Sequence, residues 1–161
     1  MKEALVIDQI DISLAVPSDA GAIAQLSRDA IEHGLSWRWT ARRVARSIRD
    51  SETNVVIARR GSEFLGFAIL KYEDDDSHLL LMAVAPAHRR KGVASAMLGW
   101  LETTVQAGGW ATIELEVRSR NEDAIAFYRH HGFDEAGLYP GYYEGVEDAR
   151  RMVKAMRKLV T

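Results

Sequence analysis

The sequence contains no cysteine. This absence excludes a disulfide framework, a thiolate metal site and a cysteine nucleophile, so a reducing compartment is compatible and we expect a cytoplasmic protein. The sequence also lacks a long apolar run near its start, because Lys2, Glu3, Asp8 and Asp11 interrupt the first twelve residues. We therefore expect neither a signal peptide nor a membrane-inserted segment.

An excess of charge of one sign is also missing. The chain has 21 basic and 23 acidic residues, a formal net charge of -2, which gives no overall field for nucleic acid or an anionic membrane. The five histidines are scattered, and the adjacent His130 and His131 would point to different sides of a helix, so we predict no metal centre. With 161 residues, 47% of them hydrophobic, we expect a single domain over 1–161 with its core at about 10–158.

Hydrophobic periodicity predicts a series of strands and helices. Alternation from Ile10 to Val16 indicates a half-buried strand that ends at Pro17, and Ser18 is a candidate N-cap for a helix that continues to Gly34. Further segments are expected as a helix at 40–51, a hairpin of 55–58 with 64–70, a strand at 79–84, a helix at 92–108, a strand at 112–117, a helix at 121–131, and strands at 133–138 and 152–156.

The order of these elements predicts an α/β (α+β) fold. We expect a central mixed, mostly antiparallel sheet of about six to seven strands, flanked by about four helices. The stretch from Leu79 to Val84 shows no alternation, which is typical of a strand in mid-sheet that is buried on both faces.

A basic loop with one glycine precedes the helix at 92–108. Its residues, 88–95, read His-Arg-Arg-Lys-Gly-Val-Ala-Ser. Successive backbone N–H groups at such a helix start can bind one anion, and Gly92 would let a diphosphate approach the backbone. An ordinary helix start with solvated basic residues is the alternative interpretation. The signature of a nucleotide triphosphatase loop is absent.

This loop resembles the phosphate-binding element of the GNAT superfamily, Arg/Gln-x-x-Gly-x-Gly/Ala, over residues 89–94. The resemblance implies acetyl-CoA as cosubstrate and a single GNAT-like domain. It also implies that the strand before the loop binds the pantetheine arm through its backbone, although the same residues could be plain core. The residues that the resemblance places at the cofactor are Met82, Ala83, Val84, Arg89, Arg90, Lys91, Gly92, Val93, Ala94 and Ser95.

The segment 115–133 resembles the second half of the same superfamily's core, where an asparagine contacts the cofactor and a tyrosine lies beside its sulfur. Amide formation from a thioester needs a deprotonated amine and a protonated leaving thiolate. Glu116 and Tyr128 suit these two roles, and their spacing of twelve residues (128 minus 116) is similar to that of ribosomal-protein alanine N-acetyltransferases. The resemblance places Asn121 at the cofactor.

Each of these residues also has a purely structural interpretation. Glu116 could be a solvated residue on the polar face of its strand. Tyr128 could pack its helix onto the sheet, and Asn121 could be only a helix cap. The run Asp74-Asp75-Asp76 could attract a cationic substrate, but a solvated turn is the simpler interpretation.

Three aromatic residues are candidates for acceptor binding. Trp37 falls between the first two helices, where the resembling enzymes shape the acceptor site, although it could instead anchor the core. Tyr142 and Tyr143 precede Glu-Asp-Ala and Met152, a pattern similar to that of N-terminal peptide acetyltransferases. The sequence departs from that pattern through basic residues in and beyond the last strand, Arg150, Arg151, Lys154, Arg157 and Lys158.

The resemblance therefore implies an N-acetyltransferase that moves an acetyl group directly from acetyl-CoA to a primary amine, with a peptide N-terminus as the preferred acceptor. Acetylation of a small amine such as a polyamine, an aminoglycoside or an amino acid is the alternative. A non-catalytic acyl-CoA-binding module would need neither Glu116 nor Tyr128. We expect a monomer or a homodimer.

Overall fold

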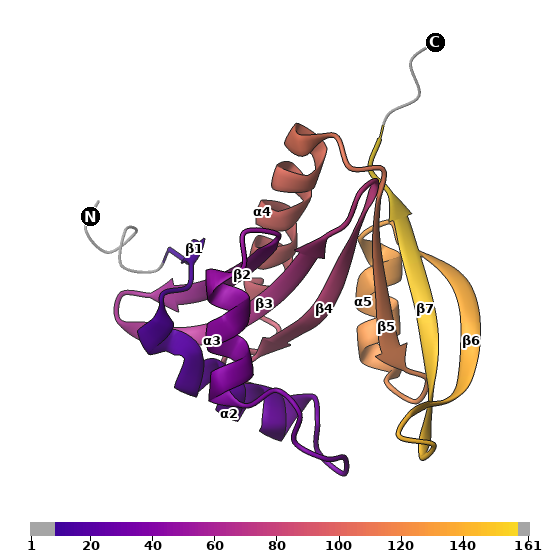
Figure 1. Ribbon diagram of the computed structural model, residues 1–161, viewed down its shortest axis with the longest axis horizontal. Helices are drawn as coiled ribbons and strands as arrows, with labels where there is room; N and C mark the ends of the chain where they lie inside the picture. Colours follow the sequence, from indigo (N-terminus) through magenta and orange to yellow (C-terminus); the bar gives the residue numbers. More distant parts are fainter. Residues whose placement is uncertain (1–8, 158–161) are drawn as a thin grey trace. The chain divides into compact units, whose positions relative to one another are not determined.

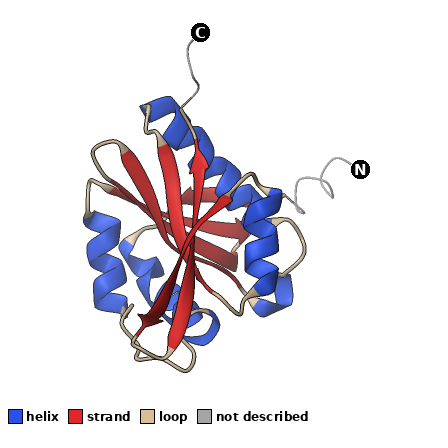
Figure 2. Ribbon diagram, turned by 90° about the vertical axis from the view of Figure 1, so that its right-hand side faces the viewer, coloured by secondary structure: helices blue, strands red, loops and turns tan. Residues whose placement is uncertain are grey.

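The computed structural model describes residues 9–157. Seven strands form a sheet in the order β1-β2-β3-β4-β5-β7-β6, and four α-helices accompany them in these residues (Figures 1 and 2). The pair β4–β5 is parallel, whereas β1–β2, β2–β3, β5–β7 and β6–β7 are antiparallel. The predicted α/β class with a mixed, mostly antiparallel sheet is confirmed.

In chain order the elements are β1 (Asp11–Leu14), η1 (Pro17–Asp19), α2 (Ala20–Ala30), α3 (Ala41–Arg49), β2 (Thr53–Arg60), β3 (Glu63–Tyr72), β4 (Asp76–Val84), η2 (Pro86–His88), α4 (Val93–Gly108), β5 (Thr112–Arg118), α5 (Glu122–His130), β6 (Asp134–Tyr143) and β7 (Glu147–Ala155).

The chain divides into two compact units. The first contains the chain up to Lys71 together with Leu81–Leu101, and the second contains Tyr72–Leu80 together with the chain from Glu102 onward. The elements β4 and α4 contribute to both units, as does β3 through its last residue, Tyr72. The predicted extent of the domain, 1–161, and the basic residue Lys158 reach beyond the described residues, so that extent stays a prediction.

In the first unit, the helix at 41–49 and the hairpin were predicted correctly. Thr40 caps α3, because its hydroxyl accepts a hydrogen bond from the backbone N–H of Arg43 at 3.3 Å. Two residues, Gly61 and Ser62, connect β2 to β3, and Gly61 has a φ of 61°, which a tight hairpin turn requires. The hairpin supplies much of this unit's buried core.

The predictions for the start of the chain were partly wrong. Ser18 does not cap a helix, because a 3-10 turn at Pro17–Asp19 precedes α2, and the Asp19 carboxylate accepts the Val16 N–H at 2.8 Å. The helix α2 ends at Ala30 and not at Gly34. The strand β1 has only four residues at the sheet edge, and the expected buried side chains of Leu14 and Val16 are about half exposed, at 55% and 54%.

The strands β4 and β5 both alternate in burial. On β5 the side chains of Ile113, Leu115 and Val117 are buried, as predicted. On β4 the prediction of burial on both faces is wrong, since only every second side chain is buried and those between are half-buried. Leucine and methionine on the half-buried face concealed this alternation in the sequence.

The hairpin β6–β7 is longer than the sequence predicted. Its strands cover Asp134–Tyr143 and Glu147–Ala155, whereas apolar patterning indicated only 133–138 and 152–156. The described side chains of β6 are almost all exposed, so its ladder of backbone hydrogen bonds to β7 extends where no hydrophobic pattern marks it. This extension brings Tyr142 and Tyr143 into a strand.

Candidate active site

Glu116 of the second unit lies one residue beyond the point where β5 stops pairing with β4. The parallel ladder runs from Asp76 opposite Thr112 to Leu79 opposite Leu115. On its other side, β5 continues to pair with β7, and Glu116 stands opposite Arg151. The Glu116 side chain is only 7% exposed, so the interpretation as a solvated surface residue is wrong.

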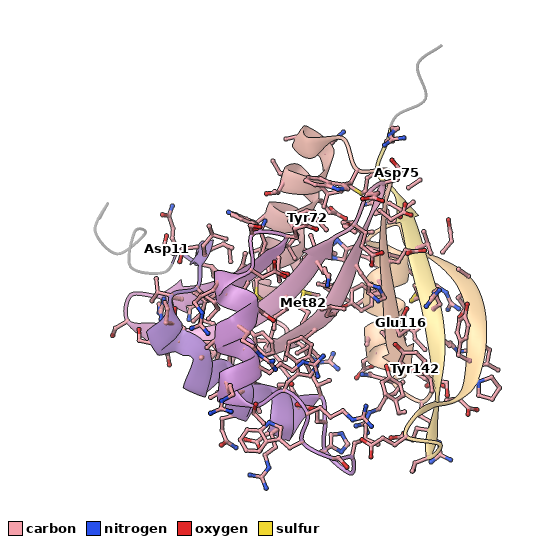
Figure 3. The ribbon with its side chains drawn as sticks, in the orientation of Figure 1. Asp11, Tyr72, Asp75, Met82, Glu116 and Tyr142 are labelled. Atoms are coloured by element: carbon pink, nitrogen blue, oxygen red, sulfur yellow. The ribbon has the colours of Figure 1, made fainter. Side chains whose placement is uncertain are left out.

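Three side chains from three strands contact the Glu116 carboxylate. His78 Nε2 lies 2.7 Å from Oε1, the Tyr142 hydroxyl donates to the same oxygen at 3.2 Å, and Arg151 Nε donates to Oε2 at 2.9 Å. Figure 3 shows Glu116 and Tyr142 close together beside β5. Since both oxygens have hydrogen-bond partners, the carboxylate is held in one orientation.

The charges in this cluster shift the pKa values of its members. Burial alone would raise the pKa of Glu116, but the hydrogen bond and charge of His78 and the charge of Arg151 outweigh burial and lower it. The hydrogen bond from Glu116 raises the pKa of His78 against the opposing effect of burial. The pair therefore favours an ionised carboxylate beside an imidazolium.

Sequence reasoning missed His78 and Arg151 as members of this cluster. His78 was counted among scattered histidines, and Arg151 was noted only as a departure from an apolar pattern. His78 lies on the half-buried face of β4 and reaches Glu116, two positions beyond the residue opposite it, Glu114. The position of His78 on the half-buried face of β4 could have identified it. The sequence did not show this face, because apolar residues on it concealed the alternation of β4.

Tyr128 and Asn121 have the structural roles that were considered as alternatives. The Tyr128 ring packs edge-on against Phe133 and Phe127, with centroids 5.4 and 5.2 Å apart, and its side chain is buried. Burial raises the pKa of the Tyr128 phenol, so the hydroxyl keeps its proton. Asn121 Oδ1 accepts the Ala124 N–H at 3.1 Å and caps α5. A further contact of either residue with a cofactor stays a prediction.

Tyr143 is half-buried beside Tyr142, with the two rings edge-on and their centroids 5.0 Å apart. The guanidinium of Arg118 lies 5.8 Å from the Tyr143 ring centroid and pairs with Glu147 at 2.7 Å. Tyr142 is 48% exposed, so it offers its ring to solvent while its hydroxyl is bonded to Glu116. These two tyrosines therefore frame one side of the carboxylate cluster.

The predicted phosphate-binding loop belongs to the first unit, between η2 and α4. Gly92 has a φ of 85°, and its carbonyl accepts the Ala96 N–H at 3.0 Å to begin the helix. A Cβ on Gly92 would have no atom within 4 Å, so the loop is open on that side. Arg90 also has a positive φ, 62°, and Arg89 Nε donates to the Val84 carbonyl at 3.3 Å. A 16-residue helix begins at Val93, directly after this loop, so the positive end of its dipole lies at the loop.

The predicted cofactor residues differ in how much of their side chains they expose. Ala83 and Val93 are buried, so only their backbone could contact a ligand. Exposed residues are Arg89, Arg90, Lys91, Gly92 and Ser95, and half-buried residues are Met82, Val84 and Ala94.

Trp37 is 40% exposed, so it does not anchor the core. The Arg28 guanidinium lies 4.9 Å from its ring centroid. The buried carboxylate of Glu32, which the sequence did not single out, holds this loop by accepting the N–H groups of Arg38 and Trp39 at 2.7 and 3.1 Å. An acceptor-binding role for Trp37 stays a prediction.

The acidic run 74–76 forms the turn that leads into β4, whose first residue is Asp76, as its simpler interpretation predicts. The Asp75 carbonyl accepts the Ala111 N–H at 2.6 Å, and the Asp76 carboxylate accepts the Thr112 hydroxyl at 2.8 Å. Within residues 9–157, no three histidine or acidic side chains gather as a metal ion would require. Among the same residues, no helix combines the length and apolarity needed to cross a membrane.

Comparison with known proteins places these features in a family. A model of the acetyltransferase (GNAT) family matches residues 22–133, which include the loop at 88–95, Glu116 and Tyr128. The chain belongs to the GNAT acetyltransferase family. This GNAT acetyltransferase is 34% identical over 114 residues to ribosomal protein bS18-alanine N-acetyltransferase of Escherichia coli K12, covering 69% of this chain and 76% of that one.

Solved structures agree with this assignment. The crystal structure of the ribosomal-protein-S18-alanine N-acetyltransferase from Escherichia coli matches this GNAT acetyltransferase with a TM-score of 0.82 and 28% identity, over 94% of this chain and 97% of that one. Arabidopsis thaliana NAA60 in complex with acetyl-CoA shares the fold, with a TM-score of 0.81 and 18% identity over 92% and 99% of the chains. The predicted family and fold are thereby confirmed.

A relative with a different substrate in its name is also similar. Streptothricin acetyltransferase of Streptomyces lavendulae is 33% identical to this GNAT acetyltransferase over 98 residues, 60% of this chain and 51% of the relative.

Proposed function

We propose that this GNAT acetyltransferase transfers the acetyl group of acetyl-CoA directly to the α-amine of a peptide or protein N-terminus. The observation that carries the proposal is the hydrogen bond from Tyr142 to Glu116, which joins a candidate peptide-binding tyrosine to a buried carboxylate. A group that can accept a proton thus lies beside hydroxyls that can bind a peptide backbone. The relative from Escherichia coli is named for acetylating an alanine of a ribosomal protein.

The first unit supplies the features that acetyl-CoA needs. The open, positive-φ backbone around Gly92 and the α4 N-terminus would bind the diphosphate, and exposed Arg89 and Lys91 would add charge. The half-buried side chains of Met82 and Val84 leave the adjoining part of β4 accessible for the pantetheine arm. We assign acetyl-CoA binding to these residues, with Asn121 as a proposed further contact.

Glu116 and Tyr128 are proposed for the two proton transfers. A peptide α-amine has an ordinary pKa of about 7.7–8.0 and must lose a proton before it attacks the thioester carbon. Glu116 would take that proton through water. Tyr128, whose raised pKa keeps it protonated, would donate to the departing CoA sulfur. No covalent acyl-enzyme forms in this scheme, because the amine attacks the thioester directly.

The resemblance to streptothricin acetyltransferase supports a second candidate, acetylation of a small amine. Small polyamines carry several positive charges and would be favoured by carboxylates that have no other cationic partner. Glu116 is already paired with His78 and Arg151, so the cluster offers little uncompensated negative charge. This pairing favours a single α-amine over a polycation.

A direct assay distinguishes the candidates. The purified protein would be incubated with acetyl-CoA and either short peptides with varied first residues or a panel of small amines, with mass detection of the products. Peptides with a blocked N-terminus and a free lysine serve as the matched control. We expect products only on free N-termini. Acetylated small amines or lysines would refute the acceptor assignment, and CoA binding without turnover of any amine would refute the enzymatic function.

A further inference from the structure

His78 connects the buried Glu116 carboxylate to solvent. Its Nε2 lies 2.7 Å from Glu116 Oε1, and its side chain is 20% exposed. Within the described range 9–157 His78 has no further hydrogen bond, and its other ring nitrogen, Nδ1, is not among the buried atoms that lack a partner. A histidine held through one nitrogen by a carboxylate, with the second nitrogen available, can receive a proton on one side and release it on the other.

Glu116 is a poor final acceptor for a proton from an amine. Burial raises the pKa of Glu116, but hydrogen bonds and charges from His78 and Arg151 outweigh burial and hold it below the usual 4.5, and Arg151 keeps its charge when His78 is neutral. A peptide α-amine has a pKa of about 7.7–8.0, far above the lowered pKa of Glu116, so a proton would not remain on this carboxylate. An imidazole lies much closer to the amine on this scale, and a base works best when its pKa lies near the working pH.

We propose that neutral His78 is the final acceptor of the proton that leaves the amine, and that it takes this proton from Glu116 across their hydrogen bond. This inference rests on the proposed function and adds a residue to its proton path. Glu116 then relays the proton and orients the imidazole, and it does not store the charge. His78 acts through Glu116, so its predicted effect is on the pH dependence of the reaction.

The protons balance over one turnover. The ammonium loses one proton through water and Glu116 to His78, after which the neutral nitrogen attacks the thioester carbon. The C–N bond forms and the C–S bond breaks, Tyr128 gives its proton to the CoA sulfur, and the second proton of the nitrogen passes to solvent, from which Tyr128 is reprotonated. The imidazolium of His78, which gained its proton on Nε2, finally releases one proton to solvent from Nδ1, and the neutral ring returns by proton exchange with solvent to the tautomer whose Nε2 accepts from Glu116. The net products are the amide, free CoA and one proton.

The surrounding charges fit this cycle. His78 faces Glu116 and Glu114 of β5 and Arg151 of β7, while Tyr142 of β6 bonds to the same oxygen of Glu116. Glu114 and Glu116 stabilise the imidazolium, whereas Arg151 opposes it and favours release of the proton. Arg151 also keeps Glu116 ionised and oriented when His78 is neutral.

The test replaces His78 with a residue that keeps the contact but cannot titrate. In His78→Gln the side-chain amide can still donate to Glu116, so a purely structural role would survive. His78→Ala removes both functions, and His130→Gln makes the same change at an exposed histidine on α5. For each full-length variant, kcat would be measured from pH 5.5 to 9 with acetyl-CoA and whichever amine the product assay identifies.

We expect the wild-type kcat to rise with pH along a limb whose midpoint lies above 6.5, and this limb to be absent in His78→Gln. At neutral pH we expect both His78 variants to lose about 10²-fold in kcat, the lower end of the range of about 10²- to 10⁴-fold for proton-transfer residues, with His130→Gln unaffected. The profiles would be repeated with amines of different pKa. A limb whose midpoint moves with the pKa of the amine reports ionisation of the substrate and not of His78.

An unchanged limb and kcat in His78→Gln would overturn the proposal. So would a loss in His78→Ala that His78→Gln fully restores at every pH, because the imidazole would then only position Glu116. Failure of the proposed function is a different result, namely no acetylated product from any amine at any pH.

Discussion

The two candidate binding regions of this GNAT acetyltransferase are built in different ways. The loop at 88–95 is local, since its backbone N–H groups and φ angles arise within eight consecutive residues. The carboxylate cluster is assembled from β4, β5, β6 and β7, whose contributing residues are up to 73 positions apart (151 minus 78). Side-chain changes should therefore affect the cluster strongly, and backbone changes should affect the loop.

Glu116→Gln should give the largest effect. The amide removes the negative charge that holds His78 and Arg151 and removes the proton relay, so kcat/KM for the amine should fall about 10²- to 10⁴-fold. Acetyl-CoA affinity should remain, because the loop in the first unit is untouched. Steady-state kinetics and calorimetry of acetyl-CoA binding measure the two quantities separately.

Glu135→Gln is the matched control for that change. Glu135 is also a carboxylate of the second unit with two arginine partners, Arg129 at 2.8 Å and Arg150 at 3.2 Å, but it is exposed. We expect no change in kcat/KM. An equal loss in both variants would mean that general disruption of ion pairs, and not the position of Glu116, controls activity.

Gly92→Ala should have a smaller effect, confined to the cofactor. A Cβ meets no atom at this position, so the cost comes from the φ of 85° and not from a clash. A non-glycine residue in such a conformation costs about 1–2 kcal/mol. Without ligand, the loop of the variant can relax away from the strained conformation, and acetyl-CoA binding must restore that conformation. The affinity for acetyl-CoA should therefore fall about 5–30-fold. The kcat at saturating acetyl-CoA should stay near the wild-type value.

The control for the loop is Gly99→Ala, inside α4. A Cβ there also meets no atom within 4 Å, but the backbone is helical, so alanine should stabilise the protein by about 0.5–1 kcal/mol without changing acetyl-CoA affinity. If Gly92→Ala bound acetyl-CoA as tightly as wild type, the conformation of the loop would not matter for binding.

The same contrast explains what the sequence could predict. Gly92 and the start of α4 were found because a short motif determines a short piece of backbone. The helix at 40–51 and the hairpin of 55–58 with 64–70 were predicted for the same reason, since each depends on residues within a few positions. Glu116 and Tyr128 were singled out through their spacing and a resemblance to a family, and their proposed roles stay predictions.

The partners of Glu116 could not be predicted in this way. Arg151 meets Glu116 only because β7 pairs with β5 in one register, and a shift of one residue would turn Arg151 to the other face. The strand β6 is almost wholly exposed, and β7 has too few apolar residues to reveal that register. Likewise, Leu14 is exposed because β1 lies at the edge of the sheet. The alternation of apolar residues in β1 does not indicate where in the sheet the strand lies.

The smallest expected effect is on stability, and it tests whether the cluster is ionised as described. The pKa of His78 is raised above 6.5, so its stabilisation is complete below about 6.5 and is lost as the pH rises through the raised value. The pKa of Glu116 is lowered below 4.5, so its stabilisation is present above about 4.5 and is lost as the pH falls through the lowered value.

The two conditions overlap between about pH 4.5 and 6.5. There, the free energy of unfolding of the wild type should exceed that of His78→Gln by about 0.5–1 kcal/mol, the range for a partly exposed ion pair, and the difference should shrink at higher and lower pH. Urea unfolding of both proteins across this range measures it. If the difference in the free energy of unfolding did not change with pH, His78 would stabilise the protein through packing alone. The description of the cluster as one held by charge would then be wrong.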